Sequence, residues 1–301
     1  MRLRISISVA IGAATGVMCW LVLARLNQGA ADFTWALRLA RSLLARANPY
    51  DTPLEQYPVT AALFALPFVR MVPDQAAGLF FGISSGLLAF GLSRGGYHRL
   101  LVFLAYPYWA AMLTAQWAPL IAASAFFPLL LPATMAKPQV GLPVFLTHLS
   151  RRGVLLCVAV GLLSLLLMPK WPLLWLQQMG YYQHFIPLRV LPGPLILLAA
   201  LWYRDQDARL LLISGFMPQR WFFDSLILWL IPQSRREILA TVFLSWGAGI
   251  WRWYHAPHSF NQVGRWSVLF FYLPMLAVLL CRRSNFPHKS TTGAESARKA
   301  P

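Results

Sequence analysis

Long, Leu-rich apolar runs separated by short polar stretches constrain this chain more than any other feature. Residues 5–24 contain no charge, and comparable runs recur as far as Cys281. A helix needs about 20 such residues to cross a bilayer. Only 12% of the 301 residues are charged, against about 25% in soluble domains. Because β-barrel strands alternate in shorter segments, we expect an all-α polytopic membrane protein.

About twelve apolar stretches are expected to form spans. They cover residues 5–26, 59–72, 76–92, 100–113, 120–135, 140–149, 154–168, 190–203, 208–216, 221–231, 238–251 and 266–281. Several are short for a bilayer, which is typical of broken or re-entrant helices sheltered inside a bundle. The first also resembles a secretory signal, but its length favours a retained span. The polar tail, residues 284–301, is expected to be disordered and cytoplasmic.

The net charge of +17 comes from an excess of Arg, in short clusters between apolar runs. Such clusters are typical of contact with anionic lipid headgroups, so we expect a bilayer and no nucleic acid as partner. The pairs expected on the cytoplasmic side are Arg2/Arg4, Arg151-Arg152, Arg204/Arg209, Arg235-Arg236 and Arg282-Arg283. The same count places twelve basic residues outside: Arg25, Arg38, Arg41, Arg46, Arg94, Arg99, Lys137, Lys170, Arg189, Arg220, Arg252 and Arg265. So many outer cations indicate an anionic substrate at the outer face of the cell inner (plasma) membrane.

Asp32 stands where the first span meets water. Residues 32–47 have helical period, with Phe33, Leu37, Ala40 and Leu44 on one face and Arg side chains on the other. This pattern predicts an interfacial helix that ends before Pro49. The Asp32 carboxylate is either the N-cap of that helix or a general base at the membrane surface, and the two roles are not exclusive.

Five further residues are candidates for substrate contact, each with a plain structural alternative. Lys137 could hold a phosphate or be a cation at the end of a span. His184, Arg189 and Arg220 are open to the same alternatives, and Asp51 could be an ordinary turn residue.

Two polar residues are expected inside the bundle. The span count places Gln116 on the cytoplasmic side, with a role in interhelical hydrogen bonding. Asp224 lies inside an expected span, where an acid needs a partner, and Arg220 is four residues away on the same helix face. The odd set of Cys19, Cys157 and Cys281 predicts neither a disulfide framework nor a metal site, and we expect no cofactor.

Several short motifs, in this order, resemble the C-type polyprenol-phosphate-dependent glycosyltransferases, most of all the mannosyltransferase-like proteins of glycosyltransferase family 87. The motifs are Ala31-Asp32-Phe33, Ala47-Asn48-Pro49-Tyr50-Asp51, Tyr57-Pro58, Ala115-Gln116 and Lys137-Pro138-Gln139 leading to Arg151-Arg152. The resemblance covers about residues 1–155. It implies one transmembrane domain (1–283), with a seven-span module (1–168), an outer loop (169–189) and variable C-terminal spans (190–283). It also implies that Asp32 is catalytic and that no metal is needed.

The leading hypothesis is therefore an inverting transfer of a sugar, mannose for preference, from a polyprenyl-phosphate donor to a hydroxyl of a lipid or glycan acceptor on the periplasmic side. The expected site comprises Asp32 as general base and a substrate-binding set of Tyr50, Asp51, Tyr57, Gln116, Lys137, His184, Arg189 and Arg220. A transporter or lipid flippase is the rival hypothesis, although no internal repeat supports it. A third is an inactive family member that acts as an assembly subunit, since the chain is short.

Overall fold

The computed structural model describes residues 1–51 and 55–284, with backbone alone at 283 and 284, and the regular secondary structure of this part is helical, with one isolated bridge between Phe185 and Gln219. Among these residues, three helices are long and apolar enough to cross a membrane: Arg2–Arg25, Pro73–Gly95 and Phe260–Arg282. A bent pair, Arg151–Leu167 and Trp171–Tyr181 at 92°, would make a fourth. An all-helical membrane protein is therefore the class that the fold supports.

The longer elements are α-helices, and several apolar segments are 3₁₀-helices instead. The α-helices are α1 (Arg2–Arg25), α2 (Phe33–Leu44), α3 (Val59–Ala65), α4 (Pro73–Leu92), α5 (Tyr106–Met112), α6 (Ala118–Ser124), α7 (Pro138–Thr147), α8 (Arg151–Leu167), α9 (Trp171–Gln178), α10 (Gln206–Phe216), α11 (Arg235–Tyr254), α12 (Phe260–Ser267) and α13 (Leu273–Ser284). The longer 3₁₀ segments are η4 (Tyr97–Leu104), η5 (Pro128–Met135), η8 (Gly193–Trp202) and η9 (Phe222–Leu230), and a π turn (Val268–Tyr272) joins α12 to α13. A 3₁₀-helix rises about 2 Å per residue, so these short segments extend further than α-helices of equal length.

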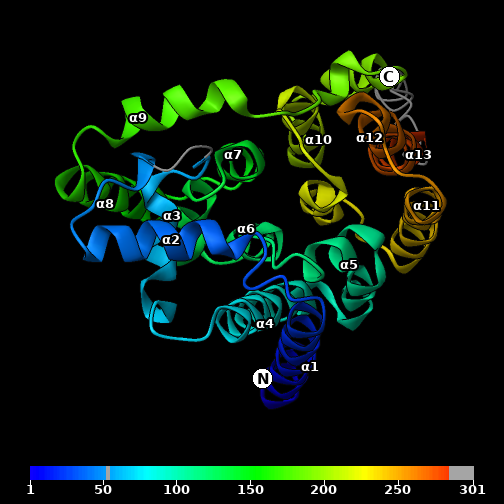
Figure 1. The fold of residues 1–301 in the computed structure, drawn as a ribbon. Helices are drawn as coiled ribbons and strands as arrows, with labels where there is room; N and C mark the ends of the chain where they lie inside the picture. Colours follow the sequence, from blue (N-terminus) through cyan, green and yellow to red (C-terminus); the bar gives the residue numbers. More distant parts are fainter. Residues whose placement is uncertain (52–54, 285–301) are drawn as a thin grey trace, which may run out of the picture.

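Helices α1 and α4 lie side by side at one edge of the bundle (Figure 1). Glycines let their backbones approach: a Cβ on Gly12 would meet the Gly82 carbonyl oxygen at 2.8 Å, and one on Gly16 would meet the Gly78 carbonyl oxygen at 2.9 Å. Small residues at such a crossing are typical of helix packing in lipid. The pair is antiparallel, because Trp20 near the end of α1 donates to Asp74 at the start of α4.

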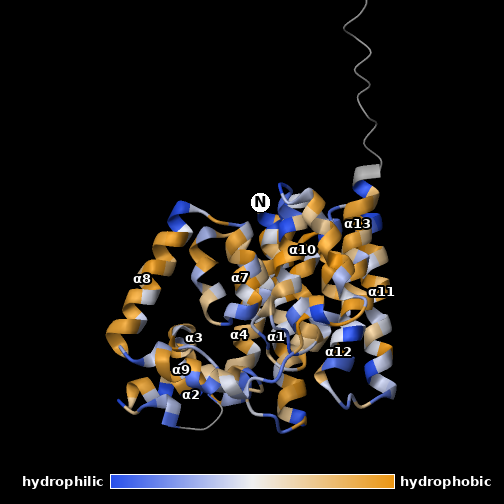
Figure 2. Ribbon diagram, turned by 90° about the horizontal axis from the view of Figure 1, so that it is seen from above, coloured by the Kyte–Doolittle hydropathy of each residue, from blue (hydrophilic) through white to orange (hydrophobic). Residues whose placement is uncertain are grey.

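Polar residues gather toward two ends of the molecule, with hydrophobic helices between them (Figure 2). We call one end the N-terminal face, defined by Arg4, Ser93 and Arg94. Arg4 bonds Ser93 Oγ and the Phe90 carbonyl there. We call the other end the Asp32 face, defined by Asp32, Tyr57 and Lys137.

Residues 59–72 do not form the expected span. The segment begins beside Tyr57, forms α3 and the short 3₁₀-helix Leu66–Phe68, and ends next to α4 on the same face. The Arg41 guanidinium of α2 donates to the carbonyls of Val69 and Met71, which holds the end of the segment against α2. The apolar stretch is thus buried under the expected interfacial helix instead of crossing the bundle.

Residues 118–136 form a hairpin where one span was expected. Helix α6 runs from the Asp32 face to a turn at Phe126 on the N-terminal face, where the Phe126 carbonyl accepts a hydrogen bond from Arg94. The 3₁₀-helix η5 then runs back to the Asp32 face. The two ends of the hairpin meet on the Asp32 face, where Lys137 donates to Gln116. Gln116 therefore lies on the same face as Asp32 and not on the opposite one as expected, whereas Arg94 and Arg99 lie on the opposite face. Both differences arise because residues 59–72, counted as a crossing, fold back. The hairpin, counted as a single crossing, brings Lys137 to the Asp32 face as expected.

The helix expected over residues 32–47 is present as α2. Its buried side includes Phe33, Leu37 and Ala40, as expected, whereas Leu44 is 62% exposed. The expected outer loop 169–189 carries α9, and Trp175 of α9 donates to the carbonyl of Gln56 at 2.9 Å. Segment 208–231 is broken at Met217–Arg220 into α10 and η9, as expected.

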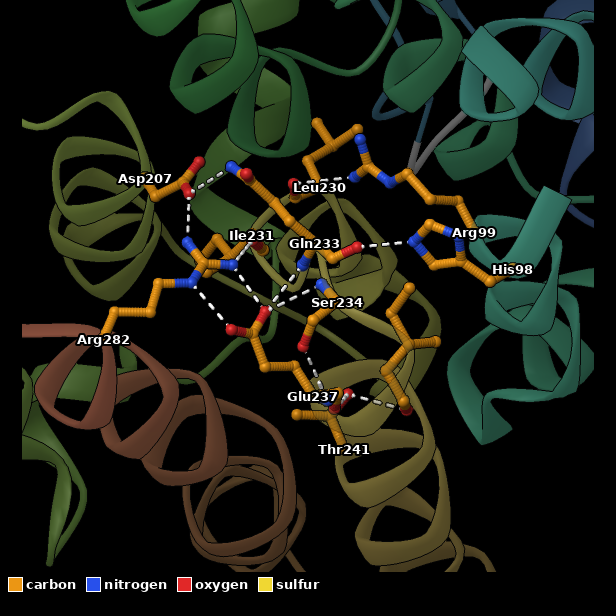
Figure 3. Close-up of polar contacts among 11 residues, drawn as sticks. His98, Arg99, Asp207, Leu230, Ile231, Gln233, Ser234, Glu237, Thr241 and Arg282 are labelled. Atoms are coloured by element: carbon orange, nitrogen blue, oxygen red, sulfur yellow. Dashed lines mark hydrogen bonds and ion pairs between the residues drawn. The ribbon is translucent and has the colours of Figure 1, made fainter. Parts of the chain in front are cut away.

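A second charged cluster ties the C-terminal helices together on the N-terminal face (Figure 3). The Arg282 guanidinium contacts Asp207 at 2.8 Å and Glu237 at 2.6 Å, and also donates to the Ile231 carbonyl. Glu237 closes a capping box with Ser234 at the start of α11. Arg282 thereby joins α10, α11, α13 and the end of η9. Nearly all of the expected disordered tail, residues 285–301, lies outside the described residues.

Candidate functional site

Asp32 lies in a tight turn between α1 and α2. Gly29 and Ala31 have positive φ values of 57° and 47°, and the Asp32 backbone N–H donates to the Thr114 carbonyl at 3.1 Å. Although Asp32 occupies the N-cap position, its side chain makes no capping hydrogen bond. The carboxylate points away from the helix and accepts a hydrogen bond from the Tyr57 hydroxyl. The capping interpretation is therefore wrong for the side chain.

Tyr57 is a fixed donor to that carboxylate. Burial raises the pKa of Tyr57 well above its usual value, and the negative charge of Asp32 raises it further. The hydroxyl consequently stays protonated and donates. The Tyr50 hydroxyl donates in turn to the Tyr57 carbonyl at 3.0 Å. Tyr50 therefore holds the backbone of Tyr57 in place and does not line the cavity that contains Asp32.

Lys137 provides the positive charge of the site. Its Nζ lies 2.7 Å from Gln116 Oε1 and 2.9 Å from Asp224 Oδ1, and its side chain is 7% exposed. Lys137 Nζ donates to Gln116 and forms an ion pair with Asp224, and the Asp32 Oδ2 atom lies 3.8 Å from it. Two buried partners therefore hold the Lys137 ammonium next to Asp32.

Asp224 was expected inside a span, but the sequence did not identify its partner correctly. It is fully buried, accepts the Arg220 backbone N–H at 2.9 Å and pairs with Lys137. Its expected partner was the Arg220 side chain, and that pairing is wrong. An acidic residue inside an apolar run is rare, and this rarity is the sequence feature that points to a functional site. It does not identify the residue that pairs with the acid.

These groups open into one cavity of about 300 Å³ on the Asp32 face. Its polar lining consists of Asp32, Gln56, Tyr57, Thr114, Gln116, Lys137, Gln139, Tyr182 and Arg220, and its aromatic lining adds Trp35, Trp221 and Phe223. Gln139 donates to the Tyr182 hydroxyl at 3.0 Å, and the Arg220 guanidinium lies 6.0 Å from the Tyr182 ring. The cavity thus combines a carboxylate with two cations from distant parts of the chain.

Besides Tyr50, three expected site residues lie outside this cavity. Asp51 is exposed and bonded to the Asn48 amide in a turn. His184 is exposed and stacks on the Tyr182 ring without lining the cavity, and Arg189 is exposed outside it. Sequence reasoning missed Gln56, Gln139, Tyr182 and the aromatic residues. Gln139 belongs to the motif Lys137-Pro138-Gln139, and Tyr182 lies in the expected outer loop 169–189.

An apolar groove of about 780 Å³ runs along α1 and α4 and touches neither Asp32 nor Lys137. Among the described residues, no three His, Cys, Asp or Glu side chains are placed to hold a metal ion. The candidate site is therefore the smaller polar cavity.

Comparison with known proteins identifies no relative. No family model, curated protein or solved structure matches this chain.

Proposed function

We propose that this protein is a membrane glycosyltransferase that moves a sugar from a polyprenyl-phosphate donor to an acceptor hydroxyl, with Asp32 as the general base. One observation carries the proposal: an Asp32 carboxylate that caps nothing and a Lys137 ammonium share a cavity at one face of an apolar helical bundle. The resemblance of the N-terminal half to family 87 glycosyltransferases agrees with it.

The reaction needs a base for the acceptor hydroxyl and positive charge for the leaving phosphate. The acceptor oxygen attacks that carbon, Asp32 takes the hydroxyl proton, and the bond from carbon to phosphate oxygen breaks with its electron pair on the phosphate. A single displacement inverts the configuration. The Tyr57 donor keeps the Asp32 carboxylate oriented and leaves its second oxygen free for the acceptor.

The leaving phosphate gains negative charge as the bond breaks. Lys137 and Arg220 both line the cavity, and their positive charges would stabilise that phosphate. Both cations are already in place before the ligand arrives, because Gln116 and Asp224 fix Lys137 and Gln56 Oε1 lies 3.5 Å from Arg220 Nη1.

Charge supports one orientation. The N-terminal face holds Arg4, Arg94, Arg99 and Arg282, which favours a cytoplasmic position for this face under the positive-inside rule. The cavity would then open to the periplasm or the cell exterior, in the inner membrane.

The test is a transfer assay with purified protein, a radiolabelled polyprenyl-phosphate mannose donor and a membrane extract as acceptor source. We expect Asp32→Asn to lower turnover by about 10²- to 10⁴-fold, the usual value of a general base. Asp51→Asn is the matched control, since Asp51 lies in the same loop outside the cavity and should keep full activity. Wild-type turnover in Asp32→Asn would exclude the general-base role, and an inactive wild type that moves lipid across vesicles would favour the flippase.

A further inference from the structure

Two smaller cavities flank the Asp32 cavity, each next to one of its tryptophans. On one side the Arg38 guanidinium lies 5.2 Å above the Trp35 ring. Arg38 also lines a cavity of about 160 Å³ with Arg41, Ser42, Pro49 and Glu55. On the other side Trp221 itself lines both the Asp32 cavity and a cavity of about 280 Å³, which we call the Trp221 cavity.

The Trp221 cavity has a neutral, aromatic and hydrogen-bonding lining. The other residues around it are Gln183, Pro257, His258, Ser259, Phe260 and Val263. None of these described residues carries a carboxylate, an ammonium or a guanidinium group. Next to the lining, the Arg252 guanidinium lies 5.9 Å from the Trp221 ring centroid.

The lining is held in place by the start of α12. Ser259 Oγ accepts from the Gln262 backbone N–H, and Gln262 Oε1 accepts from the His258 backbone N–H at 2.9 Å. The Phe260 ring meets the Trp221 ring edge to face, with centroids 6.0 Å apart. The cavity is thus a formed hollow next to the reacting groups.

We propose that the Trp221 cavity is the subsite for a carbohydrate acceptor, holding the sugar next to the one whose hydroxyl reacts. This inference rests on the proposed function. An aromatic face is electron-rich and attracts the weakly positive C–H groups of a pyranose ring, and Gln183 and His258 offer hydrogen-bonding groups to its hydroxyls.

The limited volume of the Asp32 cavity supports a separate acceptor subsite at Trp221. The Asp32 cavity must hold the donor sugar, its phosphate and the reacting hydroxyl within about 300 Å³. The remainder of an acceptor must therefore extend beyond it. Trp221 is the wall common to both cavities, so a second sugar would pack there. A disaccharide acceptor should then bind better than a monosaccharide.

The test measures binding without turnover. Purified protein in nanodiscs, free of sugar detergents, is titrated with methyl α-mannoside, methyl α-1,6-mannobioside, methyl α-glucoside and methyl α-maltoside, and saturation-transfer NMR reports binding. We expect at least one disaccharide to bind more tightly than its monosaccharide by about 3- to 10-fold, the scale of one aromatic contact. Trp221→Ala should abolish that advantage.

Controls separate this inference from the proposed function. His258→Ala, at an exposed position, should reduce the disaccharide advantage, while His255→Ala, an exposed histidine outside the cavity lining, should leave it unchanged. Asp32→Asn should keep disaccharide binding and lose transfer. If no disaccharide shows an advantage, or if the advantage survives Trp221→Ala, the subsite is overturned. If Trp221-dependent binding persists in a wild type that transfers no sugar, the carbohydrate site stands and the transferase function fails.

Discussion

Lys137 shows how one residue determines both stability and chemistry. Its ammonium lies between two carboxylates, with Phe223 beneath it at 4.8 Å from the ring centroid. Because Asp224 is completely buried, its charge depends on this one cation. Removing either partner alone leaves a buried charge without compensation, which is far more costly than removing both.

We therefore expect Lys137→Met to destabilise the protein by about 3–5 kcal/mol. Lys137→Met combined with Asp224→Asn should recover most of that loss, since no buried charge then remains unpaired. Thermal unfolding of the purified variants in detergent gives the comparison. Equal melting temperatures for the single and double variants would contradict the ion pair.

The Glu55 carboxyl is expected to make the free energy of unfolding depend on pH. It lies in the loop before Tyr57, is almost completely buried, and burial raises the pKa of its carboxyl from 4.5 to about 8. Between these values the folded state binds more protons than the unfolded state. The free energy of unfolding must then fall as pH rises from about 4.5 to 8.

Glu55→Gln removes that titration. The melting temperature of Glu55→Gln minus that of the wild type should increase steadily from pH 5 to pH 8. A difference that stays constant over this range would show that Glu55 titrates normally.

At the scale of elements, glycine spacing decides how α1 and α4 pack. A Cβ on Gly82 would lie 2.7 Å from the Gly12 carbonyl oxygen and 3.0 Å from the Gly16 Cα. Both neighbours are backbone atoms in a helix and cannot move away by changing rotamer. The pair must separate to admit even one methyl group.

Gly82→Ala should accordingly cost about 1–3 kcal/mol, the usual penalty for overpacking. Gly180→Ala is the matched control, because a Cβ there meets nothing within 4 Å. Thermal unfolding again provides the measurement. A Gly82→Ala protein as stable as Gly180→Ala would mean that the helices are not in close contact.

At the scale of the whole molecule, which segments of the chain cross the helical bundle decides which residues lie on the same face. The structure places Asn48 and Gln75 on the Asp32 face and Arg94 on the N-terminal face. Counting apolar runs instead places residues 73–75 on the side opposite Asn48. The two arrangements therefore differ in a way that labelling can detect.

Single cysteines at Asn48, Gln75 and Arg94, in a protein whose three native cysteines are replaced by alanine, test this directly. In intact cells a membrane-impermeant maleimide should label the first two positions and not the third. Labelling of Gln75 and Arg94 from the same side would contradict the fold, and labelling of Arg94 alone would reverse the proposed orientation.

The sequence predicted local features well. The scarcity of charge fixed the membrane class, the period of residues 32–47 predicted α2, and the position of Asp32 before that helix marked it as a candidate base. These properties follow from composition and from periodicity within one element. They need no knowledge of what packs against that element.

Only the tertiary structure decided which distant residues meet. Gln116 and Lys137 are 21 positions apart, and they touch because 118–136 folds as a hairpin. Asp224 reaches Lys137 from a segment nearly 90 residues further along the chain. Hydropathy reports that a segment is apolar, but a segment that crosses the bundle and one that folds back beneath α2 are equally apolar. The difference is made by side-chain contacts between elements, such as Arg41 with the carbonyls of Val69 and Met71, and these exist only once the elements have packed.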